Sequence, residues 1–214
     1  MIYILAIIDT LFQAVGFKKR PPGQSNGLMS PFLETIRIGH AKKWINGNKV
    51  LDCGCGRGRL LDLIGSDYNY TGIDLDPALI DYLSNKYPKS NFIKGDLNKI
   101  LELVPDEKYD TIILAALIEH VSQPISLILN LRKLLKPNGI IIITTPSPSF
   151  EMIYHYGSKF GIFDKHADED HEDLISIKKL IGIIKESKLS LLKSYRFLFG
   201  ANQIVVGKKT DFEK

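Results

Sequence analysis

Residues 50–58 read VLDCGCGRG, a short apolar run that leads directly into three closely spaced glycines. The apolar run is typical of a buried strand, and the glycines predict a tight turn before a helix. Glycine lets the backbone approach a ligand closely, and the free N–H groups of a helix N-terminus favour an anionic group. The stretch therefore predicts a strand, a turn and a helix that bind a nucleotide-type ligand.

The charge beside this turn indicates which ligand it binds. Asp52 stands at the end of the strand and would repel the pyrophosphate of a dinucleotide, and the glycines are spaced G-x-G-x-G and not G-x-G-x-x-G. A ligand that carries both an ammonium and a carboxylate group suits the turn better, since Asp52 can take the ammonium and the loop amides the carboxylate. That description fits the methionine end of S-adenosylmethionine (SAM).

From Lys49 onward, short β-type runs alternate with stretches of helical periodicity, which is the rhythm of a parallel sheet. Right-handed crossovers then place helices on both faces of the sheet. The last two runs are joined by residues 200–202 only, which predicts a hairpin and an antiparallel final strand. The predicted strands span residues 49–53, 68–74, 91–94, 109–115, 139–145, 189–199 and 203–208, and the predicted helices span 59–64, 77–87, 124–135 and 177–188.

Acidic residues follow two further strands. Asp74 lies 20 residues beyond Gly54, the position where a carboxylate binds ribose hydroxyls in doubly wound folds. Asp96 closes the third strand and can accept a hydrogen bond from an adenine amino group. Leu75 and Leu97 would provide apolar faces for the adenine ring.

These motifs together resemble the class I SAM-dependent methyltransferases over residues 50–208, in the order VLDCGCGRG, GIDLDP, KGDL, YDTIILAALIEHV and LKPNGIIIITTP. The resemblance implies an α/β, doubly wound, Rossmann-like fold with seven mostly parallel strands in the order 3-2-1-4-5-7-6, the last one antiparallel. It also implies the residues that bind the cofactor, which are Asp52, Gly54, Cys55, Gly56, Asp74, Leu75, Asp96, Leu97 and Ala115.

The activity that the resemblance implies is transfer of a methyl group from SAM, in enzyme class EC 2.1.1. Residues 118–121, IEHV, look like the subgroup that methylates small molecules, including O-methyltransferases that act on quinone precursors. The expected acceptor is a small molecule or a lipid- or sugar-linked molecule, with oxygen as the methylated atom. Two alternatives stay open, a non-catalytic SAM-binding subunit and an NAD(P)-dependent dehydrogenase.

Histidines are the candidate general bases, because imidazole can take a proton near neutral pH. His120, beyond the fourth strand, and His171, in a late polar stretch, are the two candidates, whereas His155 and His166 are interpreted as solvated loop residues. Glu119 and His120 with His166 and His171 also resemble the metal site of small-RNA 2′-O-methyltransferases. Ala116 replaces an acidic ligand of that pattern, and no metal is therefore expected.

The length of 214 residues and the hydrophobic share of 44% predict one globular domain, with residues 49–214 as the methyltransferase domain. Residues 1–48 are predicted to be a helical appendage and linker, and residues 146–173 an insertion on the acceptor side. The two cysteines, Cys53 and Cys55, are too close in sequence for an ordinary disulfide, which fits a reducing, cytoplasmic setting.

The net charge of +4 is spread without dense basic runs, so nucleic acid is not the expected partner. The apolar N-terminal stretch, residues 2–17, is interrupted by polar residues and is followed by Lys18-Lys19-Arg20. It fits neither a membrane span nor a signal peptide. Residues 2–20 are expected either to pack on the domain or to contact a membrane surface peripherally. The oligomeric state is left open.

Overall fold

A computed structural model describes residues 30–148 and 174–210 and contains one seven-stranded sheet in the order β3-β2-β1-β4-β5-β7-β6. Strands β1 to β5 are parallel, whereas β7 runs antiparallel to β5 and to β6. The predicted fold class and strand order are confirmed. The strands are β1 (Lys49–Cys53), β2 (Asn69–Asp74), β3 (Asn91–Lys94), β4 (Tyr109–Ala115), β5 (Leu135–Pro146), β6 (Ser190–Phe197) and β7 (Asn202–Lys208).

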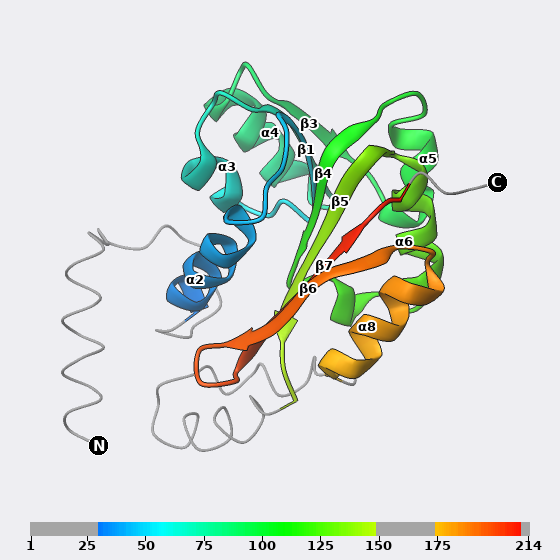
Figure 1. The fold of residues 1–214 in the computed structure, drawn as a ribbon. Helices are drawn as coiled ribbons and strands as arrows, with labels where there is room; N and C mark the ends of the chain where they lie inside the picture. The colour runs from blue at the N-terminus through cyan, green and yellow to red at the C-terminus, as the bar shows by residue number, and fades with distance from the viewer. Residues whose placement is uncertain (1–29, 149–173, 211–214) are drawn as a thin grey trace, which may run out of the picture.

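Helices cover both faces of the sheet. Figure 1 shows α2, α3 and α4 on one face and α5, α6 and α8 on the other. Among the described residues no helix has the length and apolar character that a membrane span requires. The helices are α2 (Ser30–Lys42), α3 (Arg59–Ile64), α4 (Pro77–Lys86), α5 (Ile100–Leu103), α6 (Pro124–Lys133) and α8 (Ile177–Glu186), with the 3-10 turns η1 (Leu97–Lys99) and η2 (Ile118–His120).

The strands bury side chains on both faces, as a covered parallel sheet requires. In β1, Leu51 and Cys53 belong to the core beneath α6 and α8, whereas Val50 belongs to the core beneath α2 and α3. Each fully buried aliphatic side chain stabilises the fold by roughly 1.5–3 kcal/mol. The two cores fix the strands, and the loops at their carboxyl ends are fixed with them.

Most predicted element ends agree with the structure, and the turn into β5 is the main difference. Helix α6 ends at Lys133, two residues before the predicted end, and β5 begins at Leu135 and not at Gly139. The reason is that Leu135 already pairs with Tyr109, before a register shift, and Asn138 bulges with a φ of 61°. The predicted cap of α4 is confirmed, because Asp76 Oδ1 accepts a hydrogen bond from Ala78 N at 2.8 Å.

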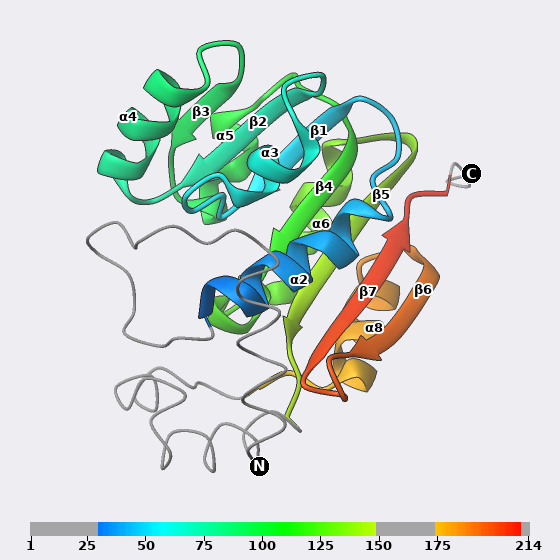
Figure 2. The same cartoon turned by 90° about the vertical axis from the view of Figure 1, so that its left-hand side faces the viewer.

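Helix α2 is an element that the sequence analysis did not predict. It packs on the same sheet as the rest of the chain, with Ile38 and Ala41 buried beneath it. Figure 2 looks onto this face and shows α2 lying across β4 and β5. The helix also contacts α3 and β6, because Lys42 Nζ donates to the carbonyl oxygen of Leu63 at 2.8 Å and His40 Nδ1 lies 3.1 Å from the Tyr195 hydroxyl.

Replacing Gly47 by alanine is expected to destabilise the fold by about 2 kcal/mol. Gly47 has a φ of 71°, and an added Cβ would overlap the Asp110 side chain. That carboxylate cannot move freely, because it accepts hydrogen bonds from Lys49 N at 2.9 Å and from Asn48 N at 3.2 Å. Thermal or urea unfolding measures the change. Gly39→Ala is the matched control, since Gly39 lies in α2 with open space around it and should become slightly more stable. An unchanged free energy of unfolding in Gly47→Ala would contradict this prediction.

Candidate functional site

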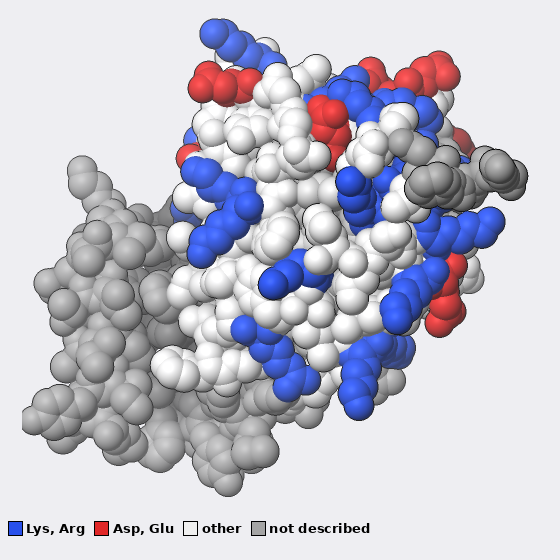
Figure 3. All heavy atoms as spheres, viewed as in Figure 1, with Lys and Arg blue, Asp and Glu red and all other residues white. Residues whose placement is uncertain are grey.

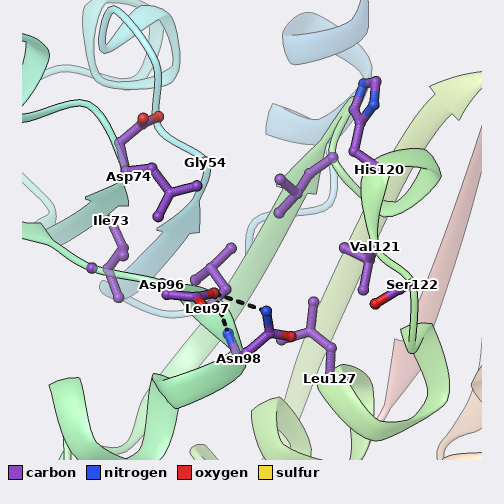
Figure 4. A pocket seen from close by; sticks show the side chains of 13 residues that line it. Gly54, Ile73, Asp74, Asp96, Leu97, Asn98, His120, Val121, Ser122 and Leu127 are labelled. Atoms are coloured by element: carbon purple, nitrogen blue, oxygen red, sulfur yellow. Dashed lines mark hydrogen bonds between the residues drawn. The ribbon is translucent and has the colours of Figure 1, made fainter. Parts of the chain in front are cut away.

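A cavity of about 250 Å³ opens at the carboxyl ends of the central strands, where doubly wound folds bind their ligands. In Figure 4 the residues that follow β2 and β3, among them Asp74 and Asp96, lie on one side, and His120, Val121 and Ser122 lie opposite. The walls are mostly apolar with a few polar groups, which is the usual make-up of a small-molecule site. The lining residues are Gly54, Ile73, Asp74, Leu75, Gly95, Asp96, Leu97, Asn98, Leu117, His120, Val121, Ser122 and Leu127.

The glycine-rich turn forms the edge of this cavity. Gly54, Gly56 and Gly58 have φ angles of 71°, 49° and 75°, which side chains rarely adopt. The N–H groups of Gly54 and Cys55 donate to the carbonyl oxygen of Ile73 at 2.8 and 3.0 Å. The turn is thus tied to the end of β2, and its glycines leave the backbone open to a ligand.

Asp74 joins the turn to the cavity. Its Oδ2 accepts a hydrogen bond from Gly56 N at 2.8 Å, and its Oδ1 accepts one from Asp76 N at 3.1 Å. A carboxylate can accept about four hydrogen bonds, so two such contacts leave capacity for the paired hydroxyls of a ribose. Asp74 therefore lies where the sequence predicted it, with its orientation fixed by the backbone.

The residues predicted to bind adenine also line this cavity. Asp96 caps η1, because its Oδ1 accepts from Asn98 N and from Asn98 Nδ2, both at 2.9 Å. These contacts orient one oxygen of the carboxylate and leave the other to a ligand. Leu97 and the largely exposed Leu75, at 67% exposure, line the same cavity and provide apolar faces.

Four of the nine predicted cofactor residues do not line the cavity, and Asp52 is the most informative of them. Its carboxylate is 3% exposed and accepts a 2.6 Å hydrogen bond from the Tyr70 hydroxyl. Burial raises the pKa of Asp52 to about 7, partly opposed by the Tyr70 hydrogen bond. Its predicted contact with a ligand ammonium stays a prediction.

The other three residues outside the cavity lining are Cys55, Gly56 and Ala115. Cys55 packs against Ile80 and Leu83, and burial raises the pKa of its thiol, as it does for Cys53. These thiols are therefore packing groups and not thiolate nucleophiles near neutral pH. Gly56 reaches the site only through its N–H on Asp74, and Ala115 packs at the end of β4 in the core beneath α2.

Sequence reasoning missed Arg37, which lies on α2 close to Glu119, the residue before the cavity-lining His120. Its Nε is buried and has no hydrogen-bond partner among the described residues, and the same is true of Glu119 Oε2. Burial lowers the pKa of Arg37, whereas the nearby carboxylates of Glu119 and Glu34 raise it. Buried polar atoms are normally satisfied, so an unpaired donor and an unpaired acceptor on neighbouring side chains indicate a place for a charged ligand.

His120 lies at the rim of the cavity on η2 and is exposed to solvent. The second predicted base, His171, and also His155 and His166, lie outside the described residues. Within residues 30–148 and 174–210, no cluster of three or more His, Cys, Asp or Glu side chains has the geometry to hold a metal ion.

Comparison with known sequences identifies relatives of this chain. A family model described as a methyltransferase domain matches residues 9–194. A ubiquinone biosynthesis O-methyltransferase of Rickettsia akari is 38% identical over 109 residues, which are 50% of this chain and 43% of that protein. The same enzyme of Actinobacillus pleuropneumoniae is 31% identical over 134 residues, 56% of this chain and 57% of that one. The chain thus spans about half the length of the curated relatives that it matches.

Solved structures share the fold at low sequence identity. A SAM-dependent methyltransferase of Archaeoglobus fulgidus superposes with a TM-score of 0.68 at 19% identity, covering 84% of this chain and 95% of that one. The magnesium protoporphyrin IX methyltransferase of Synechocystis, solved with S-adenosylhomocysteine (SAH) bound, gives a TM-score of 0.63 at 17% identity, with coverages of 89% and 90%.

Proposed function

Because the chain belongs to the family of methyltransferase domains, we propose that it transfers a methyl group from SAM to an oxygen atom of a small-molecule acceptor. The observation that carries the proposal is the cavity at the strand ends, where Asp74 is fixed by the glycine-rich turn. The printed activity of the O-methyltransferase relatives supports oxygen as the methylated atom.

The cavity would hold the adenosine part of SAM, and Arg37 would hold its methionine end. Asp74 would bind the ribose hydroxyls, and Asp96 with Leu97 would bind the adenine, since these groups already line the cavity. Arg37 would bind the methionine carboxylate, because its buried Nε has no partner among the described residues. SAM, when bound, supplies a methyl group activated by its sulfonium.

Methyl transfer from a sulfonium needs alignment of the nucleophile, the methyl group and the sulfur more than it needs acid or base catalysis. Effective molarity from such positioning supplies roughly 7–11 kcal/mol of the barrier. The rigid strand ends and the tied glycine turn provide this alignment. His120 at the rim would take the proton of an acceptor hydroxyl, and His171 is the second candidate for that role.

The acceptor that we propose is lipid-linked, because the curated relatives are named for ubiquinone biosynthesis. An enzyme with such an acceptor would work in the cytoplasm at the membrane surface. The sequence of residues 2–20, an apolar stretch followed by Lys18-Lys19-Arg20, supports a peripheral contact there.

Calorimetric titration of the purified chain with SAM, SAH and NADH tests the cofactor. Micromolar binding of the two adenosyl ligands supports the proposal, whereas binding of NADH alone would favour a dehydrogenase. Incubation with methyl-labelled SAM and phenolic or catecholic acceptors then tests turnover. Binding of SAM without transfer to any acceptor class would favour a non-catalytic SAM-binding subunit.

Replacing Arg37 by glutamine is expected to weaken SAH binding about thirtyfold and to leave adenosine binding unchanged. The reason is that SAH carries the carboxylate that Arg37 would pair with, whereas adenosine lacks it. Titration with both ligands measures the difference. Lys42→Gln, on the same helix, is the matched control, since Lys42 Nζ donates to the carbonyl oxygen of Leu63, outside the cavity lining. An equal loss of affinity for SAH and adenosine would mean that Arg37 stabilises the fold and does not bind the methionine carboxylate.

A further inference from the structure

The charges of the described residues are unevenly divided along the chain. Residues 174–210 carry eight basic residues against one acidic residue, Glu186, a net charge of +7. Residues 30–148 carry fourteen basic against thirteen acidic residues, a net charge of +1. The excess positive charge of the described part therefore belongs to α8, β6 and β7, at the edge of the sheet.

Six of these eight side chains are exposed and form what we call the basic face. Figure 3 shows Lys and Arg spread over the region of α8, β6 and β7, whereas most Asp and Glu side chains in this view gather at the opposite end of the molecule. On α8 the lysines lie away from Leu180 and Ile184, which are buried against the sheet. The basic face consists of Lys178, Lys179, Lys185, Lys188, Lys193 and Arg196.

The basic face is not neutralised by the described part of the protein. The ion pairs between described residues lie on other elements, such as Lys86 with Asp62 at 3.0 Å and Lys136 with Asp110 at 2.9 Å. No ion pair between described residues includes a member of the basic face. Six like charges on one edge repel one another, so a polyanionic partner would stabilise this surface.

Large apolar side chains are exposed at both ends of the edge strand β6. Leu191 and Leu192 are 38% and 49% exposed near its start, and Phe199 is fully exposed in the hairpin turn that follows it. An isolated exposed leucine needs no explanation, but apolar side chains that flank a row of lysines are typical of surfaces that lie on lipid headgroups.

We propose that the basic face, together with Leu191, Leu192 and Phe199, is a docking surface for an anionic lipid bilayer. Five of its six charged residues are lysine, which binds headgroups as a point charge, whereas arginine dominates where bases or single phosphates are recognised. The exposed apolar side chains are matched by the acyl boundary and have no counterpart in nucleic acid. None of these residues belongs to residues 2–20, and the inference does not depend on methyl transfer.

Docking through Phe199 would turn the carboxyl ends of the parallel strands, where the cavity opens, toward the bilayer. The hairpin that carries Phe199 is tied to the carboxyl end of β5, because Ser147 N donates to the carbonyl oxygen of Ala201 at 2.9 Å and Ser147 Oγ donates to that of Gly200. The carboxyl end of β5 lies beside that of β4, since the two strands are parallel. The fully exposed Phe199 thus lies at the carboxyl ends of the parallel strands, the end of the sheet at which the cavity opens.

Vesicle flotation of the full chain tests the proposal. Vesicles of phosphatidylcholine alone are compared with an equal mixture of phosphatidylcholine and phosphatidylglycerol. We expect binding to the mixed vesicles that falls with added salt, because the attraction is electrostatic. The triple variant Lys178→Glu, Lys185→Glu, Lys193→Glu should bind at least tenfold more weakly, and Phe199→Ser should lose the part of the binding that survives salt.

Matched variants control for net charge and for exposed aromatic area. Lys89→Glu, Lys94→Glu, Lys99→Glu changes the charge equally at exposed lysines of the opposite edge, and Tyr82→Ser removes another exposed aromatic ring. Unfolding curves verify that all variants fold. The proposal is overturned if both triple variants lose binding equally, if the native chain ignores the mixed vesicles, or if only a single-stranded oligonucleotide responds to the first triple. SAH titration of the basic-face triple variant and of Phe199→Ser is expected to be unchanged, which separates this surface from the cofactor site.

Discussion

Replacing Asp74 by alanine is expected to weaken the binding of both SAH and adenosine at least about a hundredfold. Of the described charged groups that line the cavity, Asp74 and Asp96, it is Asp74 that also fixes the glycine turn, through Gly56 N at 2.8 Å. Its loss would remove the proposed acceptors of two ribose hydroxyls together with the anchor of the turn. Hydrogen bonds to charged groups contribute about 1.5–3 kcal/mol each, so two of them account for a loss of this size.

Calorimetric titration with both ligands measures the effect. Asp81→Ala is the control, because Asp81 is an exposed carboxylate on α4 that does not line the cavity. Comparison with Arg37→Gln is informative, since that variant should bind SAH more weakly but bind adenosine as the native chain does. Retention of adenosine binding in Asp74→Ala would show that the ribose is held elsewhere, and the assignment of the cavity would have to be revised.

Asp74 was predictable because two periodic patterns locate it independently. A parallel strand ends where its apolar run ends, and the carboxyl ends of such strands meet at one edge of the sheet. Gly54 and Asp74 follow two neighbouring strands, so their meeting needs only the strand order. The observed order and register confirm both.

Arg37 was not predictable in the same way. Among the α2 side chains whose burial is described, residues 33–42, only Ile38 and Ala41 are buried, so the sequence of the helix carries a weak periodic signal. Nothing in residues 30–42 indicates that the helix lies across β4 and β5. The role of Arg37 depends on that tertiary placement, which brings it close to Glu119, more than eighty positions further along the chain.

Asp52 is the opposite case, because its burial follows from the alternation of side chains along a strand. Strand residues alternate between faces, so Asp52 shares a face with Val50 and not with Leu51. Val50 pairs with Tyr70 in the register of β1 and β2, which puts the tyrosine hydroxyl on the same face as Asp52. The alternation therefore accounts for the hydrogen bond from Tyr70 to Asp52, and the contact of Asp52 with a ligand ammonium stays a prediction.

The enclosure of Asp52 predicts a pH-dependent stability. Its pKa is raised from an ordinary value of 3.8 to about 7 because the carboxylate is buried. Between these two values the unfolded chain has released a proton that the folded chain keeps. Stability from this group is therefore complete below about pH 4, falls as the pH rises toward 7, and is constant above it.

The free energy of unfolding of the native chain, relative to Asp52→Asn, should fall by about 4 kcal/mol between pH 4 and pH 8, since each pKa unit corresponds to about 1.4 kcal/mol. Asparagine keeps the size and the acceptor for the Tyr70 hydroxyl but cannot ionise, so the difference isolates Asp52 from the other carboxyl groups. Urea unfolding at a series of pH values measures it. A constant difference across the series would mean that Asp52 is already ionised in the folded protein, with water or a cation compensating its burial. A difference that rises with pH would mean that folding lowers the pKa of Asp52.

If the predicted fall in stability is found, SAM binding near pH 6 should also release protons from the native chain and none from Asp52→Asn, because a ligand ammonium would favour the ionised carboxylate.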